Sequence, residues 1–431
     1  MVLSKNLQTH IENICNIGIR LAGSANERRA AEYAAEKCRS YGVQATIEDF
    51  PVMERCVEEE HLFLRIDGQW QEFPCSLFGA SVSTGGKMLE ADVVWFDSHT
   101  DYQRGDLSYL KGKAVVHLGC HIETAGYYRA LMLAEPAFLI FVDTRFTSSL
   151  PLADGLFPAY SRKYGAKPTV NAAYFDAWKW KKEKADKARL CVTGTFKKSL
   201  SCNMIAEIPG TAPELGCVYA GGHHDTQAGT VGADDNATGT AAMIELARML
   251  SAKPHLRTIR LISFGAEEHL SLGSASYVRR HRLEVEKNGV FMANFDTYGS
   301  LMGWNCLQSI GTDEQLQLLK DIFKKQDLML AAETEVSPYV DNFPFNAAGV
   351  PSFWIYRRNC VCGHFYHHRA DATPDKLDFD LCASIVLAGA EVISFFADTR
   401  DISACRNFTE TQKSQIRNYW ESVYGGWQVT E

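Results

Sequence analysis

The sequence has no excess of basic residues, no apolar leader and no long hydrophobic run. Lys and Arg together number 44 against 52 Asp and Glu, which gives a net charge of −8. A general nucleic-acid binder needs a basic face, so this balance argues against a nucleic-acid partner. The first six residues lack the apolar segment of a signal peptide, and no apolar run approaches a membrane span in length. We therefore expect a cytoplasmic protein without a membrane partner.

Cysteines do not form a recognisable scaffold. There are 13, an odd number at irregular spacings, which is typical of reduced thiols in the cytoplasm. Cys360 and Cys362 stand close to His364, but no second cysteine pair lies nearby, so ordinary loop thiols are the better interpretation than a soft-metal or redox patch. The chain of 431 residues, 46% of them hydrophobic, is long enough for two or three domains.

The pattern of apolar residues divides the chain into parts. Helical spacing over 6–17 and 26–41 precedes a half-buried strand over 43–47. Residues 51–199 carry short apolar runs broken by Gly, Asp and Pro, which indicates a small β-rich inserted domain. We predict one discontinuous catalytic domain made of 1–50 and 200–400, the insertion at 51–199, and a C-terminal extension at 401–431 of unknown role.

Strand and helix patterns alternate regularly after residue 203. Apolar runs over 217–222, 258–264, 289–295 and 350–355 are separated by helical patterns, the last of them over 380–396. This alternation predicts an α/β fold: a mixed, largely parallel sheet with helices on both faces.

Polar side chains follow four of these predicted strands. They are His223, His224 and Asp225; Glu267 and Glu268; Asp296; and, past a loop, His367, His368 and Asp371. Ligands of α/β sheets bind beyond the carboxyl ends of the strands, so we expect these groups to meet at one edge.

The chemistry of this set favours divalent metal ions. Imidazoles with several carboxylates suit zinc, and manganese or cobalt would also fit. So many carboxylates are better explained by two ions about 3.5–4 Å apart than by one. Glu267 and Glu268 can then divide the work between a general base and a metal ligand. A surface charge pair would be the ordinary interpretation of Glu-Glu alone, but this pair follows a buried strand.

Five motifs resemble the co-catalytic dizinc aminopeptidases, the family that contains bacterial leucyl aminopeptidases and glutamate carboxypeptidase II. They are His223-His224-Asp225, the segment 232–239 (G-A-D-D-N-A-T-G), the segment 267–274 (E-E-H-L-S-L-G-S), Asn294-Phe295-Asp296, and His367-His368-Arg369-Ala370-Asp371. The strong part of the match covers about 203–396, and 20–50 matches the family's opening helix and strand more loosely.

The resemblance implies a role for each matching position. Asp234 would bridge two Zn²⁺ ions. His223 and Asp296 would complete the coordination of one ion, and Glu268 and His367 that of the other. Glu267 would be the general base, and Asp225 would orient the ring of His223. The motif register selects His223 and His367 over their neighbours His224 and His368. Asp371 would support His367.

The inserted unit and the substrate pocket match the family less closely. Residues 51–199 loosely resemble a protease-associated domain. The family's S-D-H near the pocket is here Val340-Asp341-Asn342, a departure at the positions that line the pocket. Asp341 is kept as a substrate-binding candidate, and Tyr339 or Tyr356 could help to polarise the substrate carbonyl.

The resemblance implies an exopeptidase acting on peptides, and an aminopeptidase is the main interpretation. A glutaminyl cyclase with one zinc would share the scaffold, and an inactive receptor-like relative would have lost ligands that are all present here. A carboxypeptidase would need a cation for the substrate's α-carboxylate, which Arg357, Arg358 or Arg369 could supply. Native metal, side-chain preference and oligomeric state are left open by the sequence.

Overall fold

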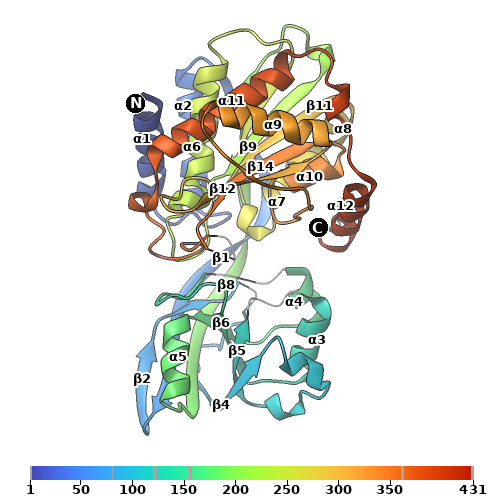
Figure 1. Cartoon of the computed structure of the whole chain (residues 1–431). Helices are drawn as coiled ribbons and strands as arrows, with labels where there is room; N and C mark the ends of the chain where they lie inside the picture. The colour runs from blue at the N-terminus through green and yellow to red at the C-terminus, as the bar shows by residue number, and fades with distance from the viewer. Residues whose placement is uncertain are drawn as a thin grey trace.

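The chain forms two lobes joined by a pair of long strands (Figure 1). The structure, a computed structural model, describes residues 2–79, 81–119, 124–153, 155, 158–360 and 364–428. We call the lobe that contains β9–β14 the α/β lobe and the lobe that contains β2–β7 the inserted lobe. Strands of both belong to one continuous sheet in the order β13-β12-β14-β11-β9-β10-β8-β4-β5-β6-β7-β3.

The centre of the α/β lobe is a run of parallel strands. β9 (Cys217–His223) lies between β10 (Thr258–Phe264) and β11 (Gly289–Phe295), and β14 (Ser352–Arg358) continues the sheet beyond β11. β9 and β11 are buried along their whole length. Because these strands are parallel, their carboxyl ends meet at one edge, next to the junction with the inserted lobe.

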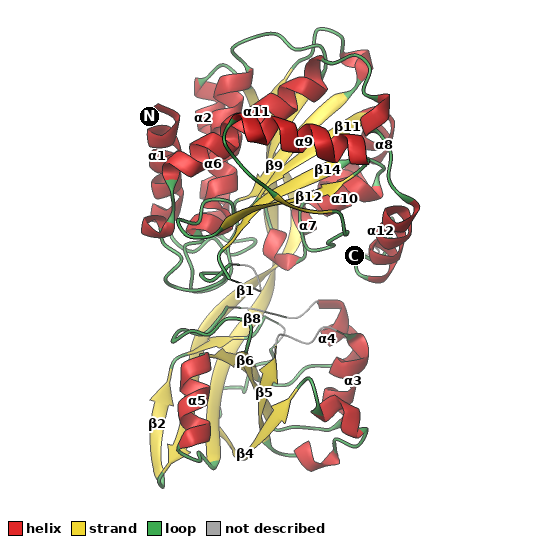
Figure 2. Ribbon diagram, viewed as in Figure 1, coloured by secondary structure: helices red, strands yellow, loops and turns green. Residues whose placement is uncertain are grey.

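Helices cover both faces of this sheet (Figure 2). One apolar core contains residues from α1 (Val2–Asn16), α2 (Ala25–Ser40), α6 (Thr238–Leu250), α9 (Asp313–Lys325) and α11 (Phe379–Asp398). The opposite face is covered by α7 (Leu272–Arg280), α8 (Arg282–Asn288) and α10 (Asn342–Ala347). The predicted fold class is therefore confirmed.

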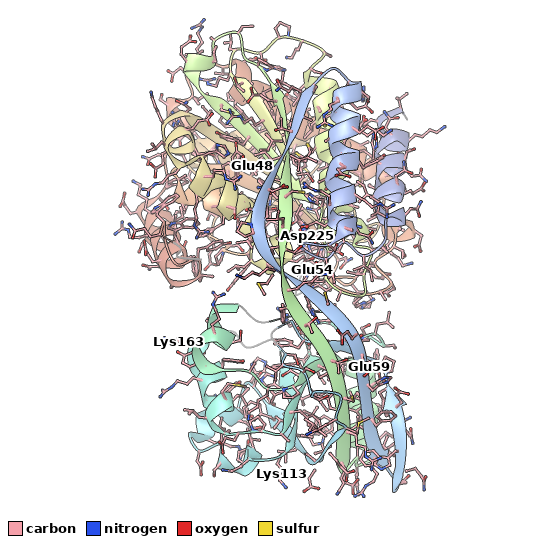
Figure 3. The ribbon with its side chains drawn as sticks, turned by 180° about the vertical axis from the view of Figure 1, so that it is seen from behind. Glu48, Glu54, Glu59, Lys113, Lys163 and Asp225 are labelled. Atoms are coloured by element: carbon pink, nitrogen blue, oxygen red, sulfur yellow. The ribbon has the colours of Figure 1, made fainter. Side chains whose placement is uncertain are left out.

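The two lobes are connected by β1 (Gln44–Ile66) and β8 (Lys187–Ile208), which pair antiparallel from Gln44↔Glu207 to Arg65↔Lys187. Figure 3 shows the pair running from Glu48 in the α/β lobe, past Glu54 at the waist, to Glu59 in the inserted lobe. The register shifts between Val57 and Glu59, which marks a β-bulge. The sequence pattern predicted only the two ends of β1 as separate short strands.

The inserted lobe has a core of its own. β4 (Leu89–Asp97), β5 (Ala114–Gly119), β6 (Phe138–Asp143) and β7 (Thr169–Ala172) are parallel neighbours. The helices α3 (Ala125–Leu133), α4 (Pro158–Tyr164) and α5 (Tyr174–Lys182) accompany them, and β2 (Gln69–Phe73) and β3 (Cys75–Leu77) complete the strands. Trp180 of α5 is fully buried against Phe73. Cys362, one of the expected loop thiols, lies outside the described residues.

Helix α11 corrects one expectation from the sequence. It is long and apolar enough to cross a membrane by length and composition, whereas we expected no such run. The structure buries Ile385, Val386, Val392, Ile393 and Phe396 of this helix in the main core of the α/β lobe. Its apolar character therefore serves the packing of a core helix.

The remaining elements lie at the margins of the α/β lobe. β12 (Trp304–Ile310) pairs antiparallel with β14, and the short β13 (Ala331–Glu333) lies beyond it. The last helix, α12 (Glu410–Ser422), packs against α10, and the ring of Tyr424 lies 5.0 Å from that of Phe343. The C-terminal segment thus closes the face that carries α7 and α10.

Candidate metal centre

The site begins at the end of β9, where close packing requires glycine. A Cβ on Gly222 would lie 2.6 Å from the Phe295 carbonyl oxygen and 2.9 Å from the Cα of Gly239. Only glycine allows the start of α6 to approach the strand this closely. The next residue, His223, is the last of β9 and its side chain is buried. The strand therefore presents this imidazole at the carboxyl edge of the sheet.

Three carboxylates surround the Nε2 atom of His223. It lies 3.1 Å from Asp235 Oδ1, 3.6 Å from Asp296 Oδ1 and 3.8 Å from Glu267 Oε2. Burial opposes the charged form, but Asp296, Asp225 and Asp235 together raise the pKa of His223 well above its ordinary value. His223, Asp235 and Asp296 form the first group that could hold a metal ion.

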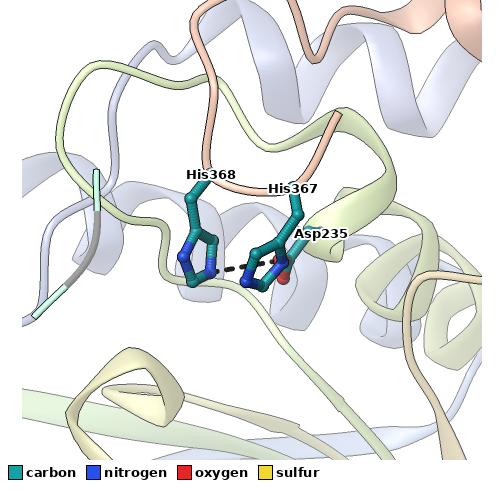
Figure 4. Close-up of side chains that lie close together, drawn as sticks. All are labelled: Asp235, His367 and His368. Carbon is teal, nitrogen blue, oxygen red and sulfur yellow. Dashed lines mark ion pairs between the residues drawn. The ribbon is translucent and has the colours of Figure 1, made fainter. Parts of the chain in front are cut away.

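A second group shares Asp235 with the first. Asp235 Oδ2 lies 3.3 Å from His367 Nδ1 and 3.4 Å from His368 Nε2, as Figure 4 shows. His368 Nε2 also lies 3.1 Å from Glu268 Oε2. One carboxylate therefore stands between two sets of donors, with a different oxygen facing each set.

Asp235, and not the predicted bridge Asp234, is the carboxylate that faces the imidazoles. The backbone at Asp235 and Asn236 leaves helical geometry, with φ/ψ of −114°/89° and −138°/56°. The two neighbouring carboxylates consequently point in different directions. Asp234 Oδ1 accepts a hydrogen bond of 2.7 Å from the Gly299 N–H, and burial raises its pKa to about 7.

The histidine pair is arranged differently from what we expected. We expected His367 as the ligand that joins Glu268, but the ion pair with Glu268 is made by His368. The two rings stack with centroids 3.5 Å apart, so both face Asp235. Asp371, the expected support of His367, instead forms an ion pair of 2.7 Å with Arg369. Both histidines therefore belong to the second group, and His368 alone of the two pairs with Glu268.

Asp225 contacts both halves of the site. Its Oδ1 lies 3.4 Å from His223 Nδ1, on the side of the ring opposite the carboxylate cluster. It also accepts hydrogen bonds from the N–H groups of Glu267 (2.9 Å) and Glu268 (3.1 Å). One fully buried carboxylate thus fixes the ring of His223 and the backbone that carries the two glutamates.

Glu267 lies at the rim of the cluster with one oxygen held. The Ser271 hydroxyl donates to Glu267 Oε1 at 3.0 Å, while Oε2 faces His223. Burial, together with the neighbouring Asp341, Glu268 and Asp296, raises the pKa of Glu267 well above its ordinary value. Both Ser271 and the preceding Leu270 adopt left-handed backbone conformations, which bring the serine hydroxyl back to the glutamate.

The predicted substrate-binding residues differ in position. Asp341 is fully buried, and burial raises the pKa of its carboxyl to about 7. Tyr356 is turned away from a role on the carbonyl, because its hydroxyl donates to Glu333 at 2.7 Å and its ring stacks on Trp354. Tyr339 is 52% exposed on the surface.

The inserted lobe contributes to the site in a way the sequence did not reveal. The ring of Phe146 stacks on that of His367 with centroids 5.7 Å apart. The Ala153 N–H donates a hydrogen bond of 2.8 Å to the His368 carbonyl oxygen. The hydrogen bond follows from the long-range fold and uses the backbone alone, so no sequence motif marks it.

The donor atoms fit divalent metal ions. Nε2 of His223, Nδ1 of His367 and Oδ1 of Asp296 face the cluster and are buried without a hydrogen-bond partner. Buried polar groups of this kind are normally satisfied, and two imidazoles with three carboxylates match the ligands that zinc prefers. A cavity next to the cluster is lined by Asp235, His364, His367, Asn359 and Tyr366, so a substrate could reach it.

Comparison with known proteins gives the relatives of this arrangement. Residues 203–390 match the sequence profile of Peptidase family M28. The chain is 27% identical to aminopeptidase YwaD of Bacillus subtilis over 288 residues. The aligned part covers 66% of this chain and 59% of YwaD. It is 22% identical to mouse carboxypeptidase Q over 381 residues, an alignment that covers 84% of this chain and 79% of that protein. The chain thus spans about three fifths of the length of YwaD.

A solved structure has the same fold. The zinc aminopeptidase BSAP from Bacillus subtilis superposes with a TM-score of 0.75 at 20% identity, over 95% of this chain and 98% of that one. The superposition includes both lobes, because it covers almost the whole of each chain.

Proposed function

We propose that the chain is a two-metal aminopeptidase that removes N-terminal residues from peptides. Support comes from residues 203–390, which match Peptidase family M28. The observation that carries the proposal is Asp235, whose two carboxylate oxygens face two different sets of donors. That arrangement suits a pair of divalent ions that share one carboxylate. The names of YwaD and BSAP support the choice of the amino end.

We propose zinc as the metal, with manganese or cobalt as chemically acceptable substitutes. His223 and Asp296 would hold one ion and Glu268 and His368 the other, with Asp235 between them. Bound there, the ions would polarise the scissile carbonyl and lower the pKa of water. The remaining steps depend on side chains of the chain itself.

Glu267 is the proposed general base. Its Oε2 faces the cluster, and its raised pKa makes it ready to accept a proton and to release it again. It takes the proton from the attacking water and then delivers it to the leaving amine. Ser271 holds Oε1, so the carboxylate keeps one orientation through both transfers.

Asp225 is a positioning residue in this scheme. It accepts hydrogen bonds from the N–H groups of Glu267 and Glu268 and contacts His223 Nδ1. These contacts fix the position of the general base relative to the imidazole. It also favours the tautomer of His223 in which Nε2 is free to bind metal.

The experiment that tests the function is the substitution Glu267→Gln in zinc-loaded protein. Hydrolysis of a chromogenic aminoacyl substrate should fall by about 10²–10⁴-fold, the usual contribution of a general base. Zinc content should remain at the wild-type value, because the proposed ligands are untouched. The exposed Glu421→Gln serves as a control and should behave as wild type.

Two results would count against the proposal. An unchanged kcat in Glu267→Gln would show that Glu267 is not the general base. Cleavage of peptides only from the carboxyl end by the wild-type protein would show that the protein is a carboxypeptidase. The arginines that could favour the latter already have partners: Arg357 donates to Asn305, Arg358 pairs with Glu333, and Arg369 pairs with Asp371. A measured zinc content of one ion per chain would favour a glutaminyl cyclase over a two-metal aminopeptidase.

The domain boundaries, the protease-associated character of residues 51–199 and a cytoplasmic location stay predictions. Contacts of Phe146 and Ala153 with the histidine loop support an inserted lobe that borders the substrate cleft.

A further inference from the structure

The C-terminal segment, residues 408–428, is anchored next to the proposed general base. It consists of α12 and the chain on either side of it, and Figure 1 shows α12 beside α10 at the margin of the α/β lobe. Trp420 and Tyr424 are only 3% and 8% exposed, and their rings lie 5.3 Å apart. Two aromatic side chains buried to this extent fix the segment on the lobe.

One anchor of the segment is the loop 334–341. The Tyr424 hydroxyl donates a hydrogen bond of 2.6 Å to the Pro338 carbonyl oxygen, and Gln412 Nε2 donates one of 3.0 Å to the Thr334 carbonyl oxygen. The loop ends at the fully buried Asp341. The segment therefore holds in place the loop that carries this carboxylate.

A second anchor is α7. Arg279 Nη2 donates hydrogen bonds to the carbonyl oxygens of Tyr424 (2.8 Å) and Gly426 (3.1 Å). Arg279 belongs to α7, which begins one residue after Ser271. Ser271 is the residue whose hydroxyl donates to Glu267 Oε1. The segment is thus bound to the helix that continues directly from the loop of the general base.

The loop of the general base, residues 266–271, has a strained backbone. Ala266, Leu270 and Ser271 adopt left-handed conformations with φ of 50°, 66° and 46°. Such conformations are unfavourable for residues other than glycine, and they persist where surrounding contacts hold them. One of these contacts comes from Leu270, which packs against the aromatic cluster that contains Tyr424. The C-terminal segment therefore supports the strained part of the loop.

The Tyr424 hydroxyl also lies close to the general base itself. Burial raises the pKa of Tyr424, a hydrogen bond with Ser271 lowers it, and the charges of Glu267 and Asp341 raise it again. The serine hydroxyl that holds Glu267 is thus a neighbour of the tyrosine hydroxyl. A path of direct contacts runs from the C-terminal segment through Ser271 to the reacting carboxylate.

We propose that the C-terminal segment fixes the orientation of Glu267 and that Tyr424 is a positioning residue for the reaction. Its hydroxyl binds the loop 334–341 next to Ser271, and its carbonyl oxygen binds α7 through Arg279. The proposal rests on the proposed function, because it takes Glu267 as the general base. The physical link between the segment and the loop 266–271 can be measured separately.

Kinetics of Tyr424→Phe test the positioning role, because this variant keeps the buried ring and removes only the hydroxyl. In the zinc-loaded protein, kcat for a chromogenic aminoacyl substrate should fall about 3- to 10-fold, the effect of one neutral hydrogen bond. KM should keep its wild-type value, since the buried Tyr424 does not meet the substrate. Zinc content should also be unchanged, because Asp225 still holds the backbone of Glu267 and Glu268.

Arg279→Met tests the second anchor. It should lower kcat by a similar factor, and the double variant with Tyr424→Phe should lose little more than the more severe single variant, because either change releases the same loop. Losses that multiply in the double variant would overturn the proposal. The controls are Tyr419→Phe, whose ring also contacts Phe343, and Arg417→Met, an exposed position of α12; both should keep the wild-type kcat.

Hydrogen–deuterium exchange measures the link without a substrate. The Ser271 N–H binds the Glu267 carbonyl oxygen at 2.6 Å, and the Leu272 N–H binds that of Ala266 at 3.0 Å. Peptides that contain these two amides should exchange about 3- to 10-fold faster in Tyr424→Phe than in wild type, because the loop opens more often. Peptides from β9 should exchange at the wild-type rate.

The outcomes separate the proposal from the function on which it rests. Wild-type exchange of the loop in Tyr424→Phe would overturn the link. A wild-type kcat in this variant, or a loss of kcat that follows a loss of zinc, would overturn the positioning role. A wild-type protein that hydrolyses no aminoacyl substrate would instead refute the proposed function, and faster exchange in Tyr424→Phe would still show that the segment holds the loop.

Discussion

The assignment of the shared metal ligand to Asp235 can be tested against its neighbour Asp234. The two substitutions Asp235→Asn and Asp234→Asn change the same chemical group one residue apart. Asp235 faces imidazoles at 3.1, 3.3 and 3.4 Å, whereas Asp234 accepts one backbone hydrogen bond from Gly299. The two variants should therefore differ sharply in metal content.

The expected size of the difference follows from electrostatics. Two unit charges about 4 Å apart attract by about 4 kcal/mol at an effective dielectric constant of about 20. Removing the charge of Asp235 should cost each divalent ion at least that much, which corresponds to about 1,000-fold weaker binding. Asp234→Asn keeps the oxygen that accepts from Gly299.

The assay is zinc per chain after dialysis, followed by titration with a competing chelator. Wild type and Asp234→Asn should each hold two ions, and Asp235→Asn should retain neither. Circular dichroism on all three proteins checks that the fold is intact. Two tightly held ions in Asp235→Asn, with loss in Asp234→Asn, would refute the reasoning and restore the bridge that the sequence motif suggested.

Two further predictions concern the same site. Ser271→Ala should lower kcat by about 10- to 150-fold, because a hydrogen bond to a charged group contributes about 1.5–3 kcal/mol. The hydroxyl favours the carboxylate form of Glu267, so its loss should raise the pKa of Glu267 and move the acidic limb of the pH–rate profile to higher pH. The zinc content of Ser271→Ala and the activity of the control Ser384→Ala should both equal the wild-type values. An acidic limb that does not shift would show that Ser271 does not act on Glu267. His368→Ala should lose the ion held with Glu268, whereas His367→Ala should keep two; the reverse pattern of zinc content would return the role to His367.

The sequence predicted the parts of the fold that depend on uninterrupted apolar runs. The bounds of β10 and β11 agree with the predicted ranges 258–264 and 289–295, because each of these strands buries one continuous surface. β1 was predicted only in part, since the strand becomes exposed around the waist and loses its apolar alternation there. β12 was not predicted at all; it begins with the exposed Trp304 and carries polar residues along its length.

The same limit applies within the site. The sequence supplied every donor that the structure brings together, but it could not choose between adjacent like residues. Asp234 and Asp235 are chemically equivalent, and so are His367 and His368. Which carboxylate faces the imidazoles depends on a local backbone that starts at Gly232, with φ of 51°, and leaves helical geometry at Asp235. A motif register records order along the chain and not the direction of a side chain.

What fixes that backbone lies about two hundred residues earlier in the chain. The buried guanidinium of Arg20 donates to the carbonyl oxygens of His224 (2.6 Å) and Val231 (2.8 Å), at the two ends of the loop that leads to Asp235. A second buried side chain, Glu27, accepts from the Ala266 N–H at 3.0 Å, directly before Glu267. Both act through the main chain, so neither has a chemical signature near the site.

The loose match of residues 20–50 to the family thus acquires a physical meaning. Arg20 and Glu27 flank the turn at Gly23, whose N–H also binds Glu27 at 2.7 Å. This single turn ties the loop that carries the shared carboxylate to the loop that carries the general base. The relative position of the two loops, on which proton transfer depends, is therefore set by the opening segment as well as by the sheet. A substitution at Arg20 should weaken metal binding and catalysis together, although its guanidinium contacts neither metal ligand side chains nor Glu267.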